Sequence, residues 1–116
     1  MADSTTSLAT LKQAMQQFVA ERSWESFHSP KNLVMGLSVE AAELAEHFLW
    51  MDNEASRETV KDPQEMSEVA DEMADVACYL LALSNTLGID LSEAILAKLV
   101  KNARKYPAEQ YRGRYK

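Results

Sequence analysis

The feature that most constrains the fold is a long segment, residues 63–87, that has no glycine or proline after its first position. Asp62 before it is a suitable N-cap, Pro63 suits the first helical position, and Gly88 is a typical left-handed terminator. The segment therefore predicts one long helix. The whole chain of 116 residues has only three glycines and three prolines, which favours helices elsewhere as well.

The rest of the chain has the apolar spacing of amphipathic helices, with intervals of three and four residues. We expect further helices over residues 7–22, 31 to about 50, and 90–106. A polar connector with a short helical turn is expected at residues 52–62, and irregular structure at residues 1–6 and 108–116. Four helices with short connections predict an all-α fold, a four-helix bundle or a close relative, as one domain over residues 1–116.

Composition narrows the partners that the chain can have. Its formal net charge of −6 provides no overall positive field for a nucleic-acid backbone, so we expect no nucleic-acid partner. The longest apolar run, VACYLLAL, is far shorter than the roughly 20 residues of a membrane-spanning helix. The start lacks a secretory signal and Cys78 is the single cysteine, so we expect a cytoplasmic protein. Two helices carry more apolar surface than one small bundle can bury, which predicts packing against another subunit.

Two acidic pairs at three-residue spacing interrupt the otherwise apolar helices. Glu40 and Glu43 lie in SVEAAELAEHFLW (residues 38–50), and Glu72 and Asp75 lie in the long helix. If these two helices form an antiparallel hairpin, Glu43 faces Glu72 and Glu40 faces Asp75. Four carboxylates at one level repel each other unless protons or a multivalent cation neutralise them. Oxygen ligands alone favour a hard ion, so we expect Mg²⁺, with Mn²⁺ as a substitute.

The alternative interpretation is an ordinary solvated acidic face. It fits poorly here, because small apolar residues flank Glu40 and Glu43 and no lysine or arginine stands three or four residues away. Glu65, Glu68 and Asp71 lie nearer the helix start, where carboxylates favour the helix dipole, and are interpreted as structural. The role of Glu46 is left open.

The two acidic pairs in order, EAAE (residues 40–43) and EMAD (residues 72–75), resemble those of the MazG-like, all-α nucleoside triphosphate pyrophosphatases. The segments FVAERSWESFHSPKNL, ELAEHFLW and KLVKNARKYP are similar to segments of the dCTP pyrophosphatase branch. The similarity spans about residues 8–107. Ala41-Ala42 departs from the Val-Gly that is common inside the first pair.

The resemblance implies that the chain hydrolyses a (deoxy)nucleoside triphosphate, with dCTP or a modified dCTP expected, to the monophosphate and pyrophosphate. It implies Mg²⁺ on residues that also form the catalytic set: Glu40, Glu43, Glu72 and Asp75. We assign Glu43 as the residue that orients or deprotonates the attacking water. The resemblance also implies a homodimer or, in this branch, a homotetramer, which we expect to be a dimer of dimers.

Substrate-binding residues are expected in three groups. Flat rings near the acidic pairs would stack on the base, Lys31 and Asn32 follow the turn at Pro30, and the last helix resembles the family's phosphate-binding segment, KxxxN…YP. The expected substrate-binding residues are Trp24, His28, Lys31, Asn32, Trp50, Tyr79, Lys98, Asn102 and Tyr106. Phe18 and Phe48 are expected in the core. Arg112, Arg114 and Lys116 of the basic tail are interpreted as solvated rather than as phosphate ligands.

The same sequence is also compared with two other classes of protein and with other substrates. A ferritin-like di-iron bundle requires two Glu-x-x-His pairs, and the chain has only one, from Glu25 to His28, in an expected loop. A non-enzymatic helical module could use the same acids to hold a structural ion or a basic partner. Within the resembling family, dUTP or dTTP could replace dCTP.

Overall fold

The computed structural model describes residues 1–114, which form six α-helices and two 3₁₀ turns and contain no β-strand. The helices are α1 (Leu8–Glu21), α2 (Pro30–Glu46), α3 (Asn53–Glu58), α4 (Pro63–Leu87), α5 (Leu91–Lys105) and α6 (Ala108–Tyr111). The 3₁₀ turns are η1 (Glu25–Phe27) and η2 (Thr59–Lys61). The prediction of an all-α fold is confirmed.

The ends of the central helix α4 are set by the residues that the sequence indicates. The Asp62 side chain accepts hydrogen bonds from the backbone N–H groups of Gln64 and Glu65, at 3.0 and 3.2 Å. Gly88 ends the helix with a φ of +64°, a conformation that disfavours any residue with a Cβ. Asp90 then caps α5 through the N–H of Glu93 at 2.9 Å.

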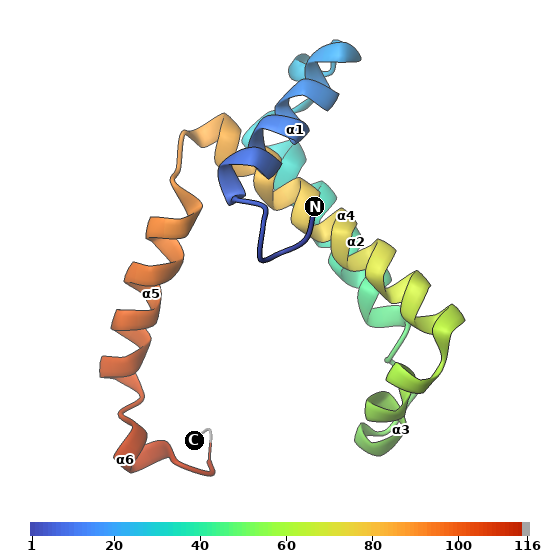
Figure 1. Cartoon of the computed structure of the whole chain (residues 1–116), viewed down its shortest axis with the longest axis vertical. Helices are drawn as coiled ribbons and strands as arrows, with labels where there is room; N and C mark the ends of the chain where they lie inside the picture. Colours follow the sequence, from blue (N-terminus) through green and yellow to red (C-terminus); the bar gives the residue numbers. More distant parts are fainter. Residues whose placement is uncertain (115–116) are drawn as a thin grey trace.

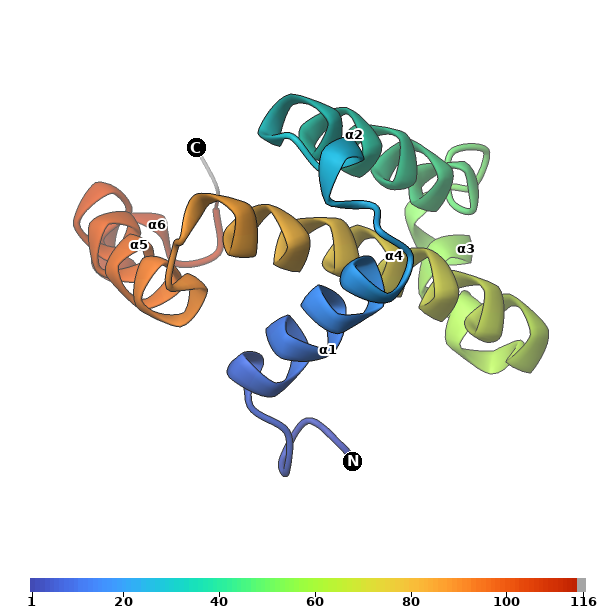
Figure 2. The same ribbon diagram turned by 90° about the horizontal axis from the view of Figure 1, so that it is seen from above.

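Helix α4 is the axis of the molecule, because both α2 and α1 pack along it (Figure 1). Helices α2 and α4 run antiparallel as a hairpin, and Figure 2 shows α1 and α2 on different sides of α4. The buried apolar residues of the described chain lie on these three helices: Val19, Leu33, Val69, Leu81 and Ala82. The expected hairpin therefore forms the centre of the fold.

Helix α5 does not close a bundle with the other helices. The chain bends by 102° between α4 and α5, and α5 extends away as a separate arm (Figure 1) with only slight contact to other elements. The radius of gyration is 17.1 Å, whereas a compact domain of this length has about 13 Å. The accessible surface is 9146 Å², whereas a compact monomer of this mass exposes about 6300 Å². A single chain is therefore more open than a closed four-helix bundle and is instead a relative of that fold.

Two expected boundaries differ from the structure. The second helix was expected to reach about residue 50, but α2 ends at Glu46 and residues 47–51 form a turn. Residues 108–116 were expected to be irregular, but Ala108–Tyr111 form the short helix α6 after Pro107. Lys116 lies outside the described residues. Within residues 1–114, no single helix is long and apolar enough to cross a membrane, and only α4 and α5 taken together, across their bend, reach that length and composition.

Candidate functional site

A cluster of four acidic side chains lies along the seam between α2 and α4, and we call it the carboxylate cluster: Glu40, Glu43, Glu72 and Asp75. One oxygen each of Glu40, Glu72 and Asp75 lies within 4.8 Å of the other two. The Glu43 carboxyl group lies close enough to both Glu40 and Glu72 to raise their pKa values. The structure thus brings together the four side chains that the antiparallel register predicts to meet.

Two oxygen atoms of this cluster are buried without a partner. Oε2 of Glu40 and Oε2 of Glu72 are almost completely removed from solvent, and neither has a hydrogen-bond donor in the described structure. Leaving a charged acceptor in this state costs free energy, because it loses its hydration and gains nothing in return. The oxygen-only ligand set and these unpartnered atoms fit a divalent cation of the hard class.

The same crowding changes the protonation of the cluster. Burial, assisted by the adjacent Glu43 carboxyl group and by the negative charges of Asp75 and Glu72, raises the pKa of Glu40 from 4.5 to about 7. Burial and the charge of Glu43 also raise the pKa of Glu72, although His47 opposes this effect. Near neutral pH the metal-free cluster therefore retains a proton that an isolated glutamate would lose.

This shift predicts how the stability of the metal-free protein depends on pH. The folded chain binds the Glu40 proton more tightly than the unfolded chain does, so this contribution to stability is complete below pH 4.5 and is lost as the pH rises through about 7. We expect the Tm of chelator-treated protein to fall between about pH 5 and pH 8, and a saturating divalent cation to reduce that fall. Calorimetry checks this, and the Glu40→Gln variant should show a smaller fall. An equal or higher Tm at the upper pH would contradict the prediction.

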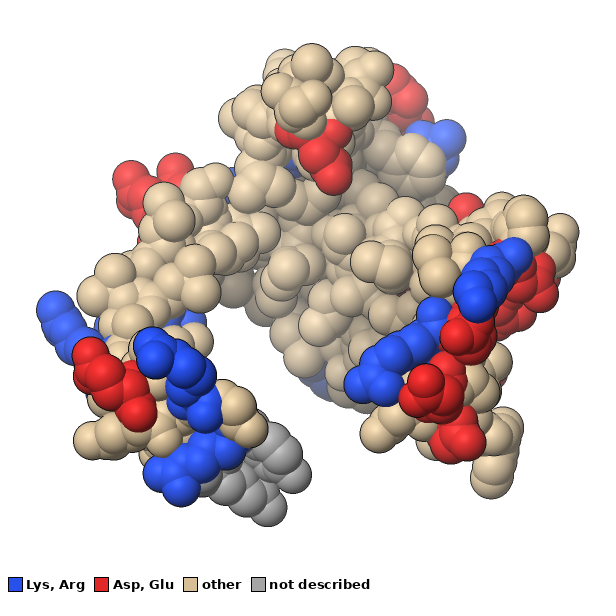
Figure 3. Space-filling view, turned by 60° about the horizontal axis from the view of Figure 1, so that its bottom comes forward, with Lys and Arg blue, Asp and Glu red and all other residues tan. Residues whose placement is uncertain are grey.

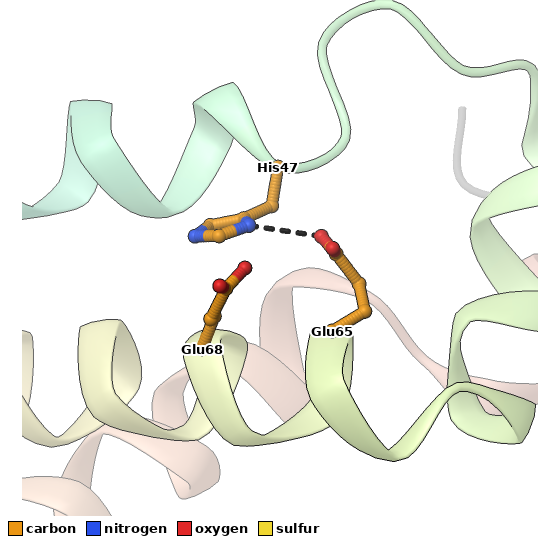
Figure 4. Close-up of side chains that lie close together, drawn as sticks. All are labelled: His47, Glu65 and Glu68. Atoms are coloured by element: carbon orange, nitrogen blue, oxygen red, sulfur yellow. Dashed lines mark hydrogen bonds and ion pairs between the residues drawn. The ribbon is translucent and has the colours of Figure 1, made fainter.

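A second group of side chains lies further along the same seam, at the end of α2 (Figure 4). The His47 Nδ1 lies 2.9 Å from Oε1 of Glu65, and Glu68 projects toward the same imidazole. The His47–Glu65 contact joins the end of α2 to the first turns of α4. Glu46, whose role was left open, is exposed.

A cavity of about 520 Å³ opens between α1, the 24–28 turn and α4. It is lined by Leu11, Ala14, Met15, Phe18, Trp24, His28, Asp75, Cys78, Tyr79 and Leu81. Three of the expected base-stacking residues, Trp24, His28 and Tyr79, therefore share one cavity. Asp75 belongs to both the cavity and the carboxylate cluster, so the two features adjoin.

Other expected substrate-binding residues lie elsewhere in the single chain. Trp50 is in the turn after α2, is 91% exposed, and does not line the cavity that contains Trp24. Lys98 and Asn102 lie on the α5 arm, away from the hairpin (Figure 1). At the end of that arm, Tyr106 packs edge-to-face on Tyr111 with ring centroids 5.2 Å apart. Within one chain, Trp50, Lys98 and Asn102 therefore do not join the cavity that holds Trp24, His28 and Tyr79.

The remaining expected residues lie near helix ends. Lys31 and Asn32 are exposed in the first turn of α2, and the Asn32 amide donates to the Phe27 carbonyl at 3.1 Å. Figure 3 shows lysine and arginine side chains gathered at the C-terminal end of the chain, where Arg112 and Arg114 are exposed. The exposure of the two arginines agrees with their interpretation as solvated residues.

Phe18 was expected in the core, but it is a wall residue of the cavity and is 42% exposed. The Arg22 guanidinium lies 3.7 Å from the centroid of its ring, and Trp24 meets the ring edge-to-face at 5.9 Å. Cys78 is half-buried in the same wall, and burial raises the pKa of its thiol. An apolar stripe at helical spacing looks the same whether it faces a core or a cavity, so the sequence held no signal that would separate the two.

Comparison with known proteins gives the family. A model of the MazG-like family matches residues 35–116, which is most of the chain. The chain belongs to the MazG-like family. This MazG-like chain is 37% identical over 110 residues to dCTP pyrophosphatase 1 of Bos taurus, and 39% identical over 101 residues to dCTP pyrophosphatase 1 of Homo sapiens. The matches cover 95% and 87% of the chain but only 65% and 59% of those relatives.

A solved structure supports the same family fold. The MazG-like chain superposes on a crystal structure of a pyrophosphatase from Archaeoglobus fulgidus DSM 4304 with a TM-score of 0.80 and 38% sequence identity. The match covers 86% of this chain and 92% of that one. The resemblance that the two acidic pairs indicate is therefore confirmed at the level of family and fold.

Proposed function

We propose that this MazG-like protein is a divalent-metal-dependent pyrophosphohydrolase that converts dCTP or a modified dCTP to the monophosphate and pyrophosphate. The observation that carries the proposal is the carboxylate cluster, with two buried unpartnered oxygens, directly beside a ring-lined cavity. Such a pair of features suits a ligand with a metal-binding polyphosphate at one end and a flat base at the other. The names of the mammalian relatives support the choice of dCTP.

The metal in this proposal is Mg²⁺, with Mn²⁺ as a substitute. Glu40, Glu72 and Asp75 would hold it through the oxygens that lie within 4.8 Å of one another. A bound magnesium ion supplies positive charge that neutralises phosphate oxygens and lowers the pKa of water.

The chain's own residues then divide the remaining work. Glu43 lies beside both Glu40 and Glu72, and we assign its carboxyl group to orient a water toward the α-phosphorus and to accept its proton. Trp24 and Tyr79 offer ring surfaces on which a cytosine stacks. Since Asp75 lines the cavity, a base in the cavity directs its phosphates toward the carboxylate cluster.

We further propose that the active form is a homo-oligomer, a tetramer built as a dimer of dimers. The open chain exposes large apolar side chains along α5, among them Leu96 at 64% and Leu99 at 58%, and Figure 3 shows few charged side chains on the face between α5 and the hairpin. Burying such surface in another copy would remove most of the excess exposed area. Lys98, Asn102 and Trp50 would then serve the cavity and carboxylate cluster of a neighbouring subunit.

The experiment that tests the function is a panel of common and modified nucleoside triphosphates assayed for pyrophosphate release with Mg²⁺. We expect release from dCTP or a 5-substituted dCTP, loss of release with chelator, and partial recovery with Mn²⁺. A preference for dUTP or dTTP would show that another pyrimidine deoxynucleotide, and not dCTP, is the substrate. Absence of release from every triphosphate would overturn the proposal and favour a non-enzymatic metal-binding module. We place the reaction in the cytoplasm, in keeping with the free thiol of Cys78.

A further inference from the structure

One contact between α2 and α4 depends on the absence of a side chain. Gly36 lies one helical turn before Glu40, and Tyr79 lies one turn after Asp75, so the two residues meet in the layer next to the carboxylate cluster. A Cβ built on Gly36 would stand 2.6 Å from Cζ and 2.9 Å from Cδ1 of the Tyr79 ring, and nearer still to Cε1. These separations are much shorter than a van der Waals contact between two carbon atoms. The ring therefore occupies space that any other residue at position 36 would fill.

The same ring also forms part of the cavity wall, beside Asp75 and Cys78. The cavity is bounded by α1 and α4, whereas Gly36 belongs to α2, on a different side of α4 (Figure 2). Tyr79 thus lies between the backbone of α2 and the cavity. Any atom added at Gly36 would displace the ring away from α2, and that displacement would narrow the cavity.

We propose that Gly36 is a positioning residue that sets the width of the base cavity by letting the Tyr79 ring lie directly against α2. The inference rests on the proposed function, because it takes the cavity as the site of the base. Gly36 would then limit the size of the base that the cavity accepts, although Gly36 does not itself line the cavity. A larger residue at position 36 would select for smaller bases without altering the carboxylate cluster.

The test is the Gly36→Ala variant, assayed with dCTP and with 5-methyl-dCTP. We expect the KM for 5-methyl-dCTP to rise about tenfold more than the KM for dCTP, since a hydrophobic pocket discriminates one methyl group by this order. We expect kcat to change little, because the carboxylate cluster is untouched. Alanine is the better helix former, so a role confined to helix stability would raise the Tm and leave the KM ratio unchanged. An unchanged ratio overturns the proposal.

Two further variants separate this contact from a general disturbance of α2. Ser38→Ala changes an exposed position of the same helix and should leave the KM ratio as in the wild type. In a Tyr79→Leu background the added Cβ meets no ring, so Gly36→Ala should then have no further effect on the ratio. The same change of ratio in that background would overturn the proposal.

A binding measurement keeps the inference separate from the proposed function. If the wild type releases no pyrophosphate from any triphosphate, the proposed function fails, and cavity width is read instead from calorimetric affinities for dCMP and 5-methyl-dCMP. Selective loss of the 5-methyl ligand in Gly36→Ala supports the role of Gly36. The proposal is overturned if the ratio of the two affinities is the same in Gly36→Ala as in the wild type, or if the wild type binds neither ligand.

Discussion

Replacing Glu72 by glutamine is expected to lower kcat for magnesium-dependent pyrophosphate release by about a thousandfold or more. The Glu72 Oε2 is one of the two buried oxygens without a hydrogen-bond donor. The negative charge of Glu43 acts on the same carboxyl group. Glutamine keeps the shape of the side chain but removes its charge, and its amide hydrogens would face the position that a cation would occupy. Glu43→Gln is expected to have a comparable effect, because it removes the acceptor for the proton of the attacking water.

The matched control for this experiment is Asp71→Asn. Asp71 precedes Glu72 on α4 and is exposed, so this variant removes the same charge from the same helix outside the carboxylate cluster. It should keep kcat within a factor of about two, in line with the small effect of most surface substitutions. Far-ultraviolet circular dichroism and size-exclusion chromatography show whether each variant is folded. A folded Glu72→Gln protein with near-wild-type kcat would remove Glu72 from the proposed site.

Replacing Leu96 by glutamate is expected to dissociate the oligomer and to abolish triphosphate hydrolysis together. Leu96 is 64% exposed on an arm with only slight contact to its own chain, so the substitution should do little damage inside one protomer. At an apolar interface between protomers, however, the buried carboxylate would be unpaired and strongly unfavourable. The oligomeric mass, measured by light scattering coupled to size-exclusion chromatography, should fall to that of a smaller assembly.

Lys101→Glu serves as the control for the oligomer experiment. Lys101 also lies on α5 and is exposed, but at 100° per residue it points to the side of the helix opposite Leu99. This variant should retain the oligomeric mass. If the wild type is monomeric and active, or if Leu96→Glu leaves the mass unchanged, the proposed assembly is wrong.

Local signals in the sequence predict the bounds of α4 and the register of the central hairpin. Asp62, Pro63 and Gly88 act on their own few residues of backbone, so their effect on the ends of α4 is local and readable. Spacing along an antiparallel pair is also local information. Counting residues to the connector predicts that Glu40 and Glu43 meet Glu72 and Asp75. In the structure, Glu40, Glu72 and Asp75 lie together and Glu43 lies beside Glu40 and Glu72.

The directions in which the faces of those helices point depend on long-range packing, which local spacing does not record. The bend of 102° after α4 carries Lys98 and Asn102 away from the carboxylates, and the early end of α2 leaves Trp50 in an exposed turn. Likewise, α1 and α2 pack on different sides of α4. This packing places Phe18 in a cavity wall and the Tyr79 ring against the backbone of Gly36. Periodicity records that a face is apolar, but not whether its partner is a core, a cavity or another subunit, because the same burial of apolar surface favours all three.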